Sequence, residues 1–165
     1  EKIVEEYKNR YGLNYTIIRY GSLYGERADH RNGVYRLLRQ ALEKGEILHR
    51  GDGEEVREYI HAKDAAKLSA DILMSNEFQN RHVMITGLEL LKQKNLLKMI
   101  QEMCPNQVSV KMTEKHYTGH YEVTPYSFRP MVARKLVANP FIDLGQGLVE
   151  CMRRIHQELH SDNEA

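Results

Sequence analysis

The stretch with the most chemical information runs from Arg50 to Ala66 and reads RGDGEEVREYIHAKDAA. A Gly-Asp-Gly turn leads into a predicted strand that carries Arg57. A guanidinium held on a strand offers a planar pair of donors that suits phosphate oxygens. Alternatively, Arg57 forms a surface salt bridge with a neighbour such as Glu54. The residues alone leave both interpretations open, an anionic ligand or a structural arginine.

A second informative stretch, RYGSLYGER, covers Arg19–Arg27 and directly follows the apolar run LNYTII. Gly21 and Gly25 permit backbone conformations that are closed to other residues, so a ligand could approach closely there. Ligands of open α/β sheets bind at the carboxyl ends of the strands. A tight connection with two packed tyrosines would explain the same residues, and both interpretations stay open.

Other chemistries find no support in the sequence. Ser22 and the eight histidines form no recognisable nucleophile motif, and no Gly-x-Gly-x-x-Gly phosphate loop is present. We predict no catalytic residue and no metal site. Asp64 is expected to cap a helix rather than to act as an acid, and His61 to be a packed or surface imidazole rather than a base.

Hydrophobic spacing predicts the elements that must position these residues. Helices are expected over 1–11, 34–46, 65–74, 92–104, 130–137 and 147–159, and strands over 13–20, 46–49, 56–61, 82–87 and 107–112. The Gly-Asp-Gly turn favours a tight reversal between two of the strands. Residues 116–129 lose their periodicity and are expected to be a loop. The fold class is therefore α/β, with too few strands for a complete doubly wound sheet.

Composition narrows the class of protein further. The 165 residues are 41% hydrophobic and 28% charged with a formal net charge of +1, which argues against an electrostatic nucleic-acid binder. No run is long and apolar enough for a membrane span, and no signal-peptide pattern opens the chain. Cys104 and Cys151 suggest buried thiols in a reducing compartment. We expect a cytoplasmic globular protein.

Together, EKIVEEYKNRYGLNYTIIRYGSLYGER and GDGEEVREYIHAKDAA resemble the C-terminal half of the extended short-chain dehydrogenase/reductases, the nucleotide-sugar epimerase and dehydratase family. The family has an Arg-Pro/Tyr-x-Asn-x-Tyr-Gly-Pro segment, and this chain carries Gly21-Ser22 in place of x-Asn and Glu26 in place of the proline. In the second motif Glu58 replaces an aspartate and Ala62 a valine. The order of the later segments HVMITG and RKLVANPFIDLGQGLVECMRRI is also similar.

The resemblance implies a set of site residues. It places the backbone of Tyr20 and Gly21 near the nicotinamide of the cofactor. The implied substrate-binding residues are Ser22 near the substrate, Asn32 at its phosphates, Leu48 and His49 at the nucleotide base, and Arg57 at the pyrophosphate. A second phosphate-binding arginine of the family is absent from the corresponding HYTGHYE segment, which leaves the role of Arg129 and the identity of the sugar nucleotide open.

The resemblance also implies a fold and a function. The fold would be the C-terminal part of a Rossmann-type doubly wound fold plus the small α/β substrate-binding domain, with an incomplete sheet. Residual Rossmann elements are expected at about 1–25 and 64–87, without the N-terminal cofactor-binding part. The intact enzyme would be a UDP-glucose 4-epimerase-like protein that uses NAD or NADP and binds a UDP-, dTDP- or GDP-sugar. The catalytic Tyr-x-x-x-Lys of the family would lie before Glu1, so the 165 residues alone are predicted to be inactive and to bind no cofactor.

The resemblance further implies a homodimer or higher self-association through the helix over 1–11, where Ile3, Val4 and Tyr7 form an apolar stripe. The alternative is that this stripe packs on the sheet of its own chain. A second hypothesis for the whole chain is a non-catalytic module, built on a degenerate version of the fold, that binds nucleotide sugars or a protein partner. The missing arginine and the substituted proline and aspartate favour that hypothesis.

Overall fold

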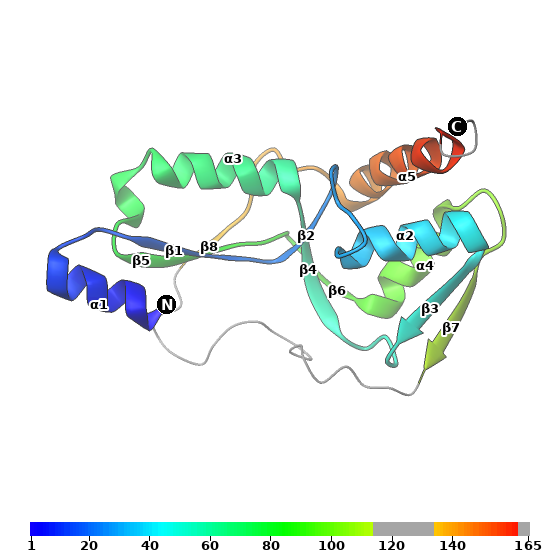
Figure 1. Ribbon diagram of the computed structural model, residues 1–165, viewed down its shortest axis with the longest axis horizontal. Coiled ribbons are helices and arrows are strands. Elements are labelled where there is room, and N and C mark those ends of the chain that lie inside the picture. The colour runs from blue at the N-terminus through cyan, green and yellow to red at the C-terminus, as the bar shows by residue number, and fades with distance from the viewer. Residues whose placement is uncertain (114–133, 162–165) are drawn as a thin grey trace.

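The computed structural model describes residues 1–113 and 134–161 and shows an α/β protein (Figure 1). Its helices are α1 (Lys2–Tyr11), α2 (Gly33–Lys44), α3 (Ala62–Leu73), η1 (Asn76–Phe78), α4 (Gln93–Met103) and α5 (Leu144–Ser161). Its strands are β1 (Thr16–Tyr20), β2 (Ser22–Tyr24), β3 (Glu46–Arg50), β4 (Val56–His61), β5 (Arg81–Ile85), β6 (Leu90–Lys92), β7 (Ser109–Thr113) and β8 (Lys135–Leu136). The loop predicted over 116–129, with Arg129 and HYTGHYE, lies outside the described residues.

The described strands form small sheets in which parallel pairing dominates. Strands β1, β5 and β8 make one parallel sheet in the order β1-β5-β8, with Ile18 opposite Val83. Strand β4 pairs in parallel with β2 and antiparallel with β6. Strands β3 and β7 form a separate parallel pair. Parallel pairing needs crossover connections, here largely helical, and this confirms the predicted α/β class.

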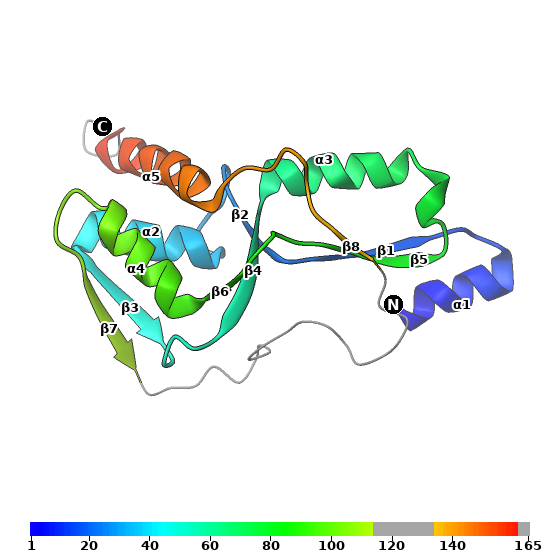
Figure 2. The same cartoon turned by 180° about the vertical axis from the view of Figure 1, so that it is seen from behind.

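Two regions with separate cores are joined by β4 (Figures 1 and 2). In the first, α3 covers one face of the β1-β5-β8 sheet, and the buried residues between them are Ile60, Ala65, Ile72, Val83 and Ile85. In the second, α2, α4 and α5 pack together beside β3 and β7. Its buried core includes Leu38, Ile47, Leu97, Leu148 and Ile155. Because β4 reaches both regions, its side chains can contact groups from either one.

Helix α2 illustrates how the sequence produces its element. Val34, Leu37, Leu38 and Ala41 recur at helical spacing, and all four are buried on one side. Gly45 ends the helix in the left-handed conformation with φ 61°, a conformation that glycine adopts without steric cost. The helix therefore turns a polar face away from the core, and part of that face borders the site described below.

Three details of the predicted elements are wrong. His61, not Asp64, is the N-cap of α3, because its side chain accepts a hydrogen bond from the Lys63 amide. The helix predicted over 130–137 is replaced, in its described part, by strand β8, because pairing with Met84 and Ile85 satisfies that backbone instead. Helix α5 begins at Leu144 rather than at residue 147.

The chain does turn at Gly51 and Gly53, both of which have positive φ angles, but the strands on either side do not pair with each other. Strand β3 pairs with β7, and β4 pairs with β2 and β6. The turn thus redirects the chain from one sheet to another. Among the described residues, no helix is long and apolar enough to cross a membrane.

Candidate functional site

A cleft of about 1050 Å³ opens between α2, β3 and β4. Its wall is formed by Ser22, Leu23, Arg31, Asn32, Gly33, Val34, Arg36, Leu37, Gln40, Lys44, Glu46, Leu48, His49, Arg50, Glu55, Arg57, Tyr59 and Gln93. All five residues predicted to bind substrate are among them. The structure therefore brings these five residues together from β2, the start of α2, β3 and β4, although Ser22 and Arg57 are 35 positions apart in the sequence.

Positive charge predominates in the cleft wall. Five lysine and arginine side chains line it, against two glutamates. Arg31 is also held by Asp29, at 2.6 Å from Nη2 to Oδ2, and this guanidinium lowers the pKa of Asp29 to about 2. The amino-terminal end of α2 opens on the same cleft, and helix N-termini favour anions. The electrostatics suit a ligand that carries phosphate groups.

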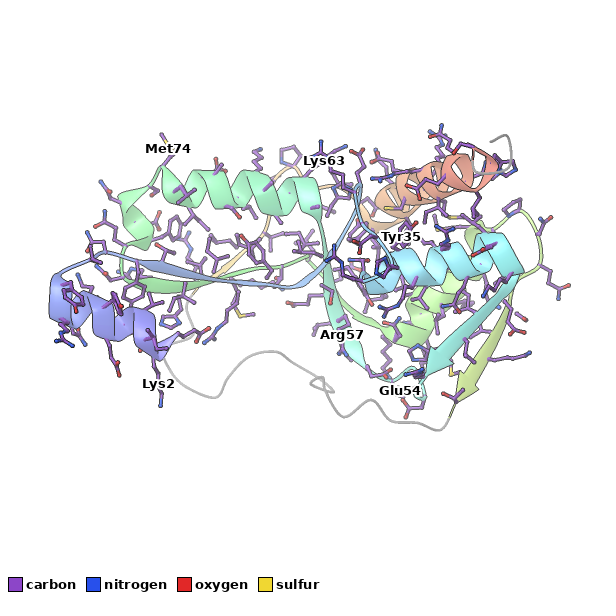
Figure 3. All side chains as sticks on the ribbon, viewed as in Figure 1. Lys2, Tyr35, Glu54, Arg57, Lys63 and Met74 are labelled. Carbon is purple, nitrogen blue, oxygen red and sulfur yellow. The ribbon has the colours of Figure 1, made fainter. Side chains whose placement is uncertain are left out.

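Arg57 is half-buried on β4 and lies below α2 (Figure 3). Its Nη1 donates a hydrogen bond to the Val56 carbonyl at 2.9 Å, which fixes the plane of the guanidinium. Glu54, the salt-bridge partner considered from the sequence, pairs with Lys92 and Lys94 instead, and these ammonium groups lower its pKa to about 2. Arg57 is thus a cation in the cleft wall at a fixed position.

Asn32 has a structural task as well as a place in the cleft. Its Oδ1 accepts a hydrogen bond from the Tyr35 amide at 3.1 Å, which caps α2. Its Nδ2 donates to the Leu23 carbonyl at 2.8 Å, which ties α2 to β2. The side chain is therefore locked in place, and any contact with a ligand has to use its remaining N–H and lone pair.

Leu48 and His49 occupy the β3 end of the cleft. The Leu48 side chain is 50% exposed, and the amide of Leu48 donates to Gln40 Oε1 at 2.9 Å. The His49 side chain is mostly buried, with Nε2 3.6 Å from Glu55 Oε2. An apolar surface beside an imidazole and a carboxylate can accommodate a planar, hydrogen-bonding ring.

Tyr20 and Gly21, the residues predicted to contact the cofactor, do not line this cleft. Tyr20 ends β1 and its hydroxyl lies 2.8 Å from Ser69 Oγ. Gly21 follows it at a place of close packing, where a Cβ would stand 2.7 Å from the Glu58 carbonyl oxygen and 3.3 Å from Thr86. The structure therefore separates the predicted residues into a group of five in the cleft and a pair at the end of β1.

Sequence reasoning missed Tyr59 and Gln93, which meet in the cleft wall. The Tyr59 hydroxyl donates to Gln93 Oε1 at 2.7 Å, and burial raises the pKa of Tyr59 to about 12. Tyr59 also begins the sequence Tyr-x-x-x-Lys, which ends at Lys63. The pattern is split between β4 and α3, and the Lys63 ammonium pairs with Glu26 at 2.7 Å. These two residues are thus not the partners in proton transfer that such a spacing provides on a helix.

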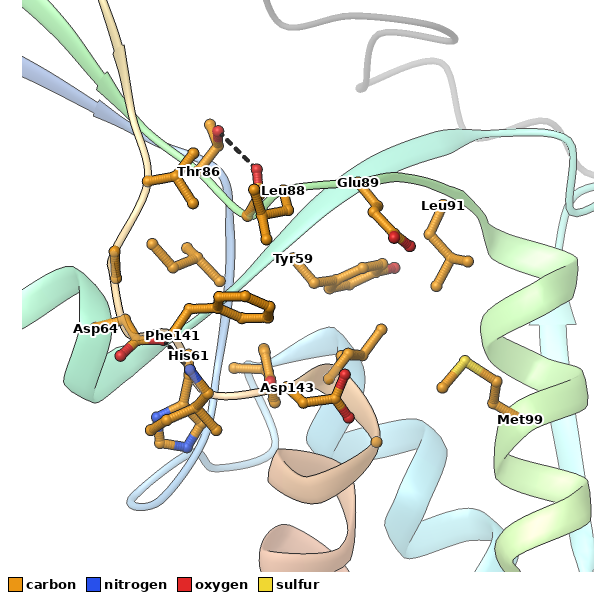
Figure 4. Close-up of a pocket in the computed structure, with 18 residues that line it drawn as sticks. Tyr59, His61, Asp64, Thr86, Leu88, Glu89, Leu91, Met99, Phe141 and Asp143 are labelled. Atoms are coloured by element: carbon orange, nitrogen blue, oxygen red, sulfur yellow. Dashed lines mark hydrogen bonds between the residues drawn. The ribbon is translucent and has the colours of Figure 1, made fainter.

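Tyr59 also lines a second, smaller cavity of about 240 Å³ on another side of β4 (Figure 4). His61 and Asp64 border it too. His61 is 1% exposed, so its imidazole is packed rather than on the surface, and burial lowers its pKa. The Asp64 carboxylate accepts a hydrogen bond from the Ile142 amide at 2.8 Å and so holds the segment before α5.

Among the described residues, no group of three or more His, Cys, Asp or Glu side chains could hold a metal ion. The sequence does contain the spacing His-x-x-x-His twice, at His116/His120 and at His156/His160, and only the second pair lies among the described residues. His156 and His160 stand four positions apart on α5. Cys104 and Cys151 are free thiols, and only Cys151 is fully buried.

Comparison with known protein families gives one match. Residues 1–87 match the NAD dependent epimerase/dehydratase family. That segment includes β1 to β5 and therefore most of the cleft wall.

Two curated proteins illustrate the similarity. The chain is 33% identical over 93 residues to a putative UDP-glucose 4-epimerase of Methanocaldococcus jannaschii, a match that covers 54% of this chain and 30% of that protein. It is 29% identical over 129 residues to a UDP-N-acetyl-alpha-D-glucosaminuronate decarboxylase of Bacillus cytotoxicus. This match covers 75% of this chain and 38% of that protein. The chain thus spans about a third of the length of these relatives.

Solved structures share the fold. A UDP-glucuronic acid 4-epimerase from Bacillus cereus, in complex with UDP-glucuronic acid and NAD, superposes with a TM-score of 0.74 at 18% identity. The match covers 94% of this chain and 49% of that one. The fold is therefore Rossmann-like, and the chain spans about half the length of that protein.

Proposed function

The chain belongs to the NAD dependent epimerase/dehydratase family, and we propose that it forms the substrate-binding part of a nucleotide-sugar epimerase or dehydratase. The observation that carries this proposal is the convergence of Ser22, Asn32, Leu48, His49 and Arg57 on one basic cleft. Within this part, residues of about 1–25 and 64–87 act as Rossmann elements and the remainder forms the substrate-binding region.

The cleft binds a nucleoside diphosphate sugar along its length. Arg57, fixed on β4, grips the pyrophosphate through charge-assisted hydrogen bonds, and the amino-terminal end of α2 adds its dipole. Leu48 and His49 hold the base at the β3 end. Ser22, on β2, faces the sugar. The relatives named above act on or bind UDP-sugars by their names, which supports a UDP-sugar as the first candidate.

The cofactor of the intact enzyme would be NAD or NADP, which would supply hydride-transfer chemistry for the sugar. The part of its site that this chain carries is the end of β1, where Tyr20 and Gly21 present backbone at the carboxyl edge of a parallel sheet. Gly21 fits this role because its lack of a side chain keeps the strand end close to β4 and β5. The residues do not include a glycine-rich phosphate loop, so we propose that these 165 residues alone bind no dinucleotide.

These 165 residues alone are also proposed to be inactive. An acid/base tyrosine needs a pKa near the working pH, normally with a lysine beside it. Tyr59 has its pKa raised to about 12, and its hydroxyl is committed to Gln93. Lys63 is committed to Glu26. Tyr59 and Lys63 are therefore not proposed to carry out the proton transfer.

Self-association through α1 is the remaining part of the proposal. Ile3, Val4 and Tyr7 are 69%, 42% and 53% exposed, and α1 contains no buried residue. Among the described residues, this exposure favours a stripe that the sheet of its own chain does not cover. An exposed apolar stripe of this kind favours contact with a second copy.

A titration with UDP-glucose tests the binding proposal. If Arg57 grips the pyrophosphate, Arg57→Ala removes charge-assisted hydrogen bonds worth about 1.5–3 kcal/mol. The dissociation constant should then rise roughly 10- to 150-fold. Arg10→Ala is the matched control, because Arg10 is an exposed arginine on α1 and lies outside the cleft wall. It should bind UDP-glucose as the parent chain does.

The result also separates the two hypotheses for the chain. Equal affinity in the parent chain and Arg57→Ala would refute the assigned role of Arg57. Absence of UDP-, dTDP- and GDP-sugar binding by the parent chain would favour a module that interacts with another protein. Thermal unfolding of each variant establishes that it is folded before its affinity is interpreted.

A further inference from the structure

Two histidines lie side by side on the carboxyl-terminal half of α5, the helix that ends at the C label in Figure 1. His156 and His160 are both exposed, and their rings are stacked with centroids 4.0 Å apart and planes tilted by 22°. Residues four apart on a helix occupy the same face, so the pairing is built into the helix. The substrate cleft uses neither residue.

The hydrogen bonding of His160 fixes which ring nitrogen is available. Its Nδ1 lies 2.7 Å from the carbonyl oxygen of His156. A carbonyl oxygen only accepts, so Nδ1 must carry the proton. In a neutral ring this leaves the lone pair on Nε2, which is the arrangement seen in metal-binding histidines whose other nitrogen donates to a backbone carbonyl.

We propose that His156 and His160 together bind a divalent transition-metal ion such as Zn²⁺, Ni²⁺ or Cu²⁺. Zinc–nitrogen bonds of about 2.0–2.1 Å at a tetrahedral angle require the two nitrogens to lie about 3.3–3.4 Å apart. The ring centroids lie 4.0 Å apart on one helix face, so both rings are within reach of a common ion once they rotate out of the stacked arrangement and their nitrogens converge. Water completes the coordination, so the ion binds reversibly.

The neighbouring residues define the number of protein ligands. Glu158, between the two histidines in sequence, already pairs with Arg154 at 2.9 Å and accepts a hydrogen bond from Tyr35. It therefore does not act as a third ligand. Two imidazoles favour ions in the order Cu²⁺ over Ni²⁺ and Zn²⁺ over Mn²⁺, and they do not bind Mg²⁺, which prefers oxygen ligands.

Calorimetric titration with Ni²⁺ tests the proposal in a full-length chain that carries His116→Gln and His120→Gln and serves here as the parent chain, because these two histidines repeat the His-x-x-x-His spacing. His156→Gln, His160→Gln and the control His30→Gln are compared, since His30 is a single exposed histidine in the loop before α2. A variant that lacks one histidine can hold the ion through only one imidazole. The affinity of His156→Gln and His160→Gln for Ni²⁺ should therefore be roughly 100-fold lower than that of the parent chain. The control should bind as the parent chain does, and Mg²⁺ should give no heat of binding.

A second measurement does not depend on the heat of binding. An ion that binds only the folded helix raises the unfolding temperature. Ni²⁺ should therefore raise it in the parent chain and in His30→Gln, but not in His156→Gln or His160→Gln. Binding that survives in both of these variants, or that is lost in only one of them, would overturn the two-histidine site. So would the absence of Ni²⁺ binding by the parent chain.

Discussion

Replacing Gly21 with alanine should destabilise the folded chain even when no ligand is present. Gly21 stands where the end of β1 passes over β4 and β5. A Cβ at this position would meet the Glu58 carbonyl oxygen at 2.7 Å and two Thr86 atoms at 3.3 Å. The nearest of these contacts is a backbone atom of a paired strand, which cannot rotate away as a side chain would.

The expected cost follows from the number and kind of these contacts. Forcing an additional methyl group into a packed region costs about 1–3 kcal/mol. For a chain of this size, one kcal/mol corresponds to about 2–4 °C in unfolding temperature. Gly21→Ala should therefore unfold about 2–12 °C below the parent chain. Gly87→Ala should lower the unfolding temperature by more than Gly21→Ala does, because a Cβ there would stand 1.9 Å from the Tyr59 carbonyl oxygen.

Gly33→Ala is the matched control, because no atom lies within 4 Å of the position that an added methyl group would take at the first residue of α2. Alanine is the better helix former, so Gly33→Ala should unfold at the same temperature as the parent or somewhat higher. Circular dichroism during heating, together with urea unfolding, measures all three variants. Equal stability of Gly21→Ala and Gly33→Ala would refute the packing explanation for Gly21.

Three further predictions concern other parts of the chain. Asp64→Ala should lower the free energy of unfolding in urea by about 1–3 kcal/mol because the Ile142 amide loses its acceptor, whereas Asp64→Asn should lose less. Burial lowers the pKa of His61 in the folded chain relative to the pKa of about 6.5 in the unfolded chain. The free energy of unfolding is therefore highest above about pH 6.5 and declines as the pH falls below that value. His61→Asn keeps a capping side chain and should show less decline in urea unfolding between about pH 7.5 and 5.5. Ile3→Glu should weaken self-association in light scattering and change monomer stability by less than about 0.5 kcal/mol.

Elements with a strong local pattern could be predicted from the sequence. Helix α2 combines a buried stripe, a capping Asn32 and a terminal Gly45, and all three signals lie within the segment itself. Strand β1 is similar, since its β-branched residues favour extended backbone before any partner is considered. When all the signals lie within the segment, the element can be predicted from the sequence, and contacts with distant residues determine only its position in the fold.

The errors occurred where a distant partner decided the outcome. Asp64 has the residue type and position of a helix cap, but its carboxylate accepts from Ile142, which lies 78 residues away in the sequence. His61 is the N-cap of α3 instead, because its Nδ1 accepts a hydrogen bond from the Lys63 amide. Likewise Lys135 and Leu136 have a helical pattern but become β8, since β5 offers an open edge.

The arrangement of the candidate site depends on a single residue that separates two sheets. Tyr20 is paired with Ile85 in the β1-β5-β8 sheet, whereas Ser22 is paired with Tyr59 in the sheet of β2 and β4. Gly21 lies between them, and over this one residue the chain changes from one sheet to the other. The sequence showed a strand that ends at a glycine, but it could not show that the two sides of that glycine belong to different sheets. If the sugar of the proposed substrate lies near Ser22 and the nicotinamide of the proposed cofactor lies near Tyr20, the two ligands would meet at Gly21, between the two sheets.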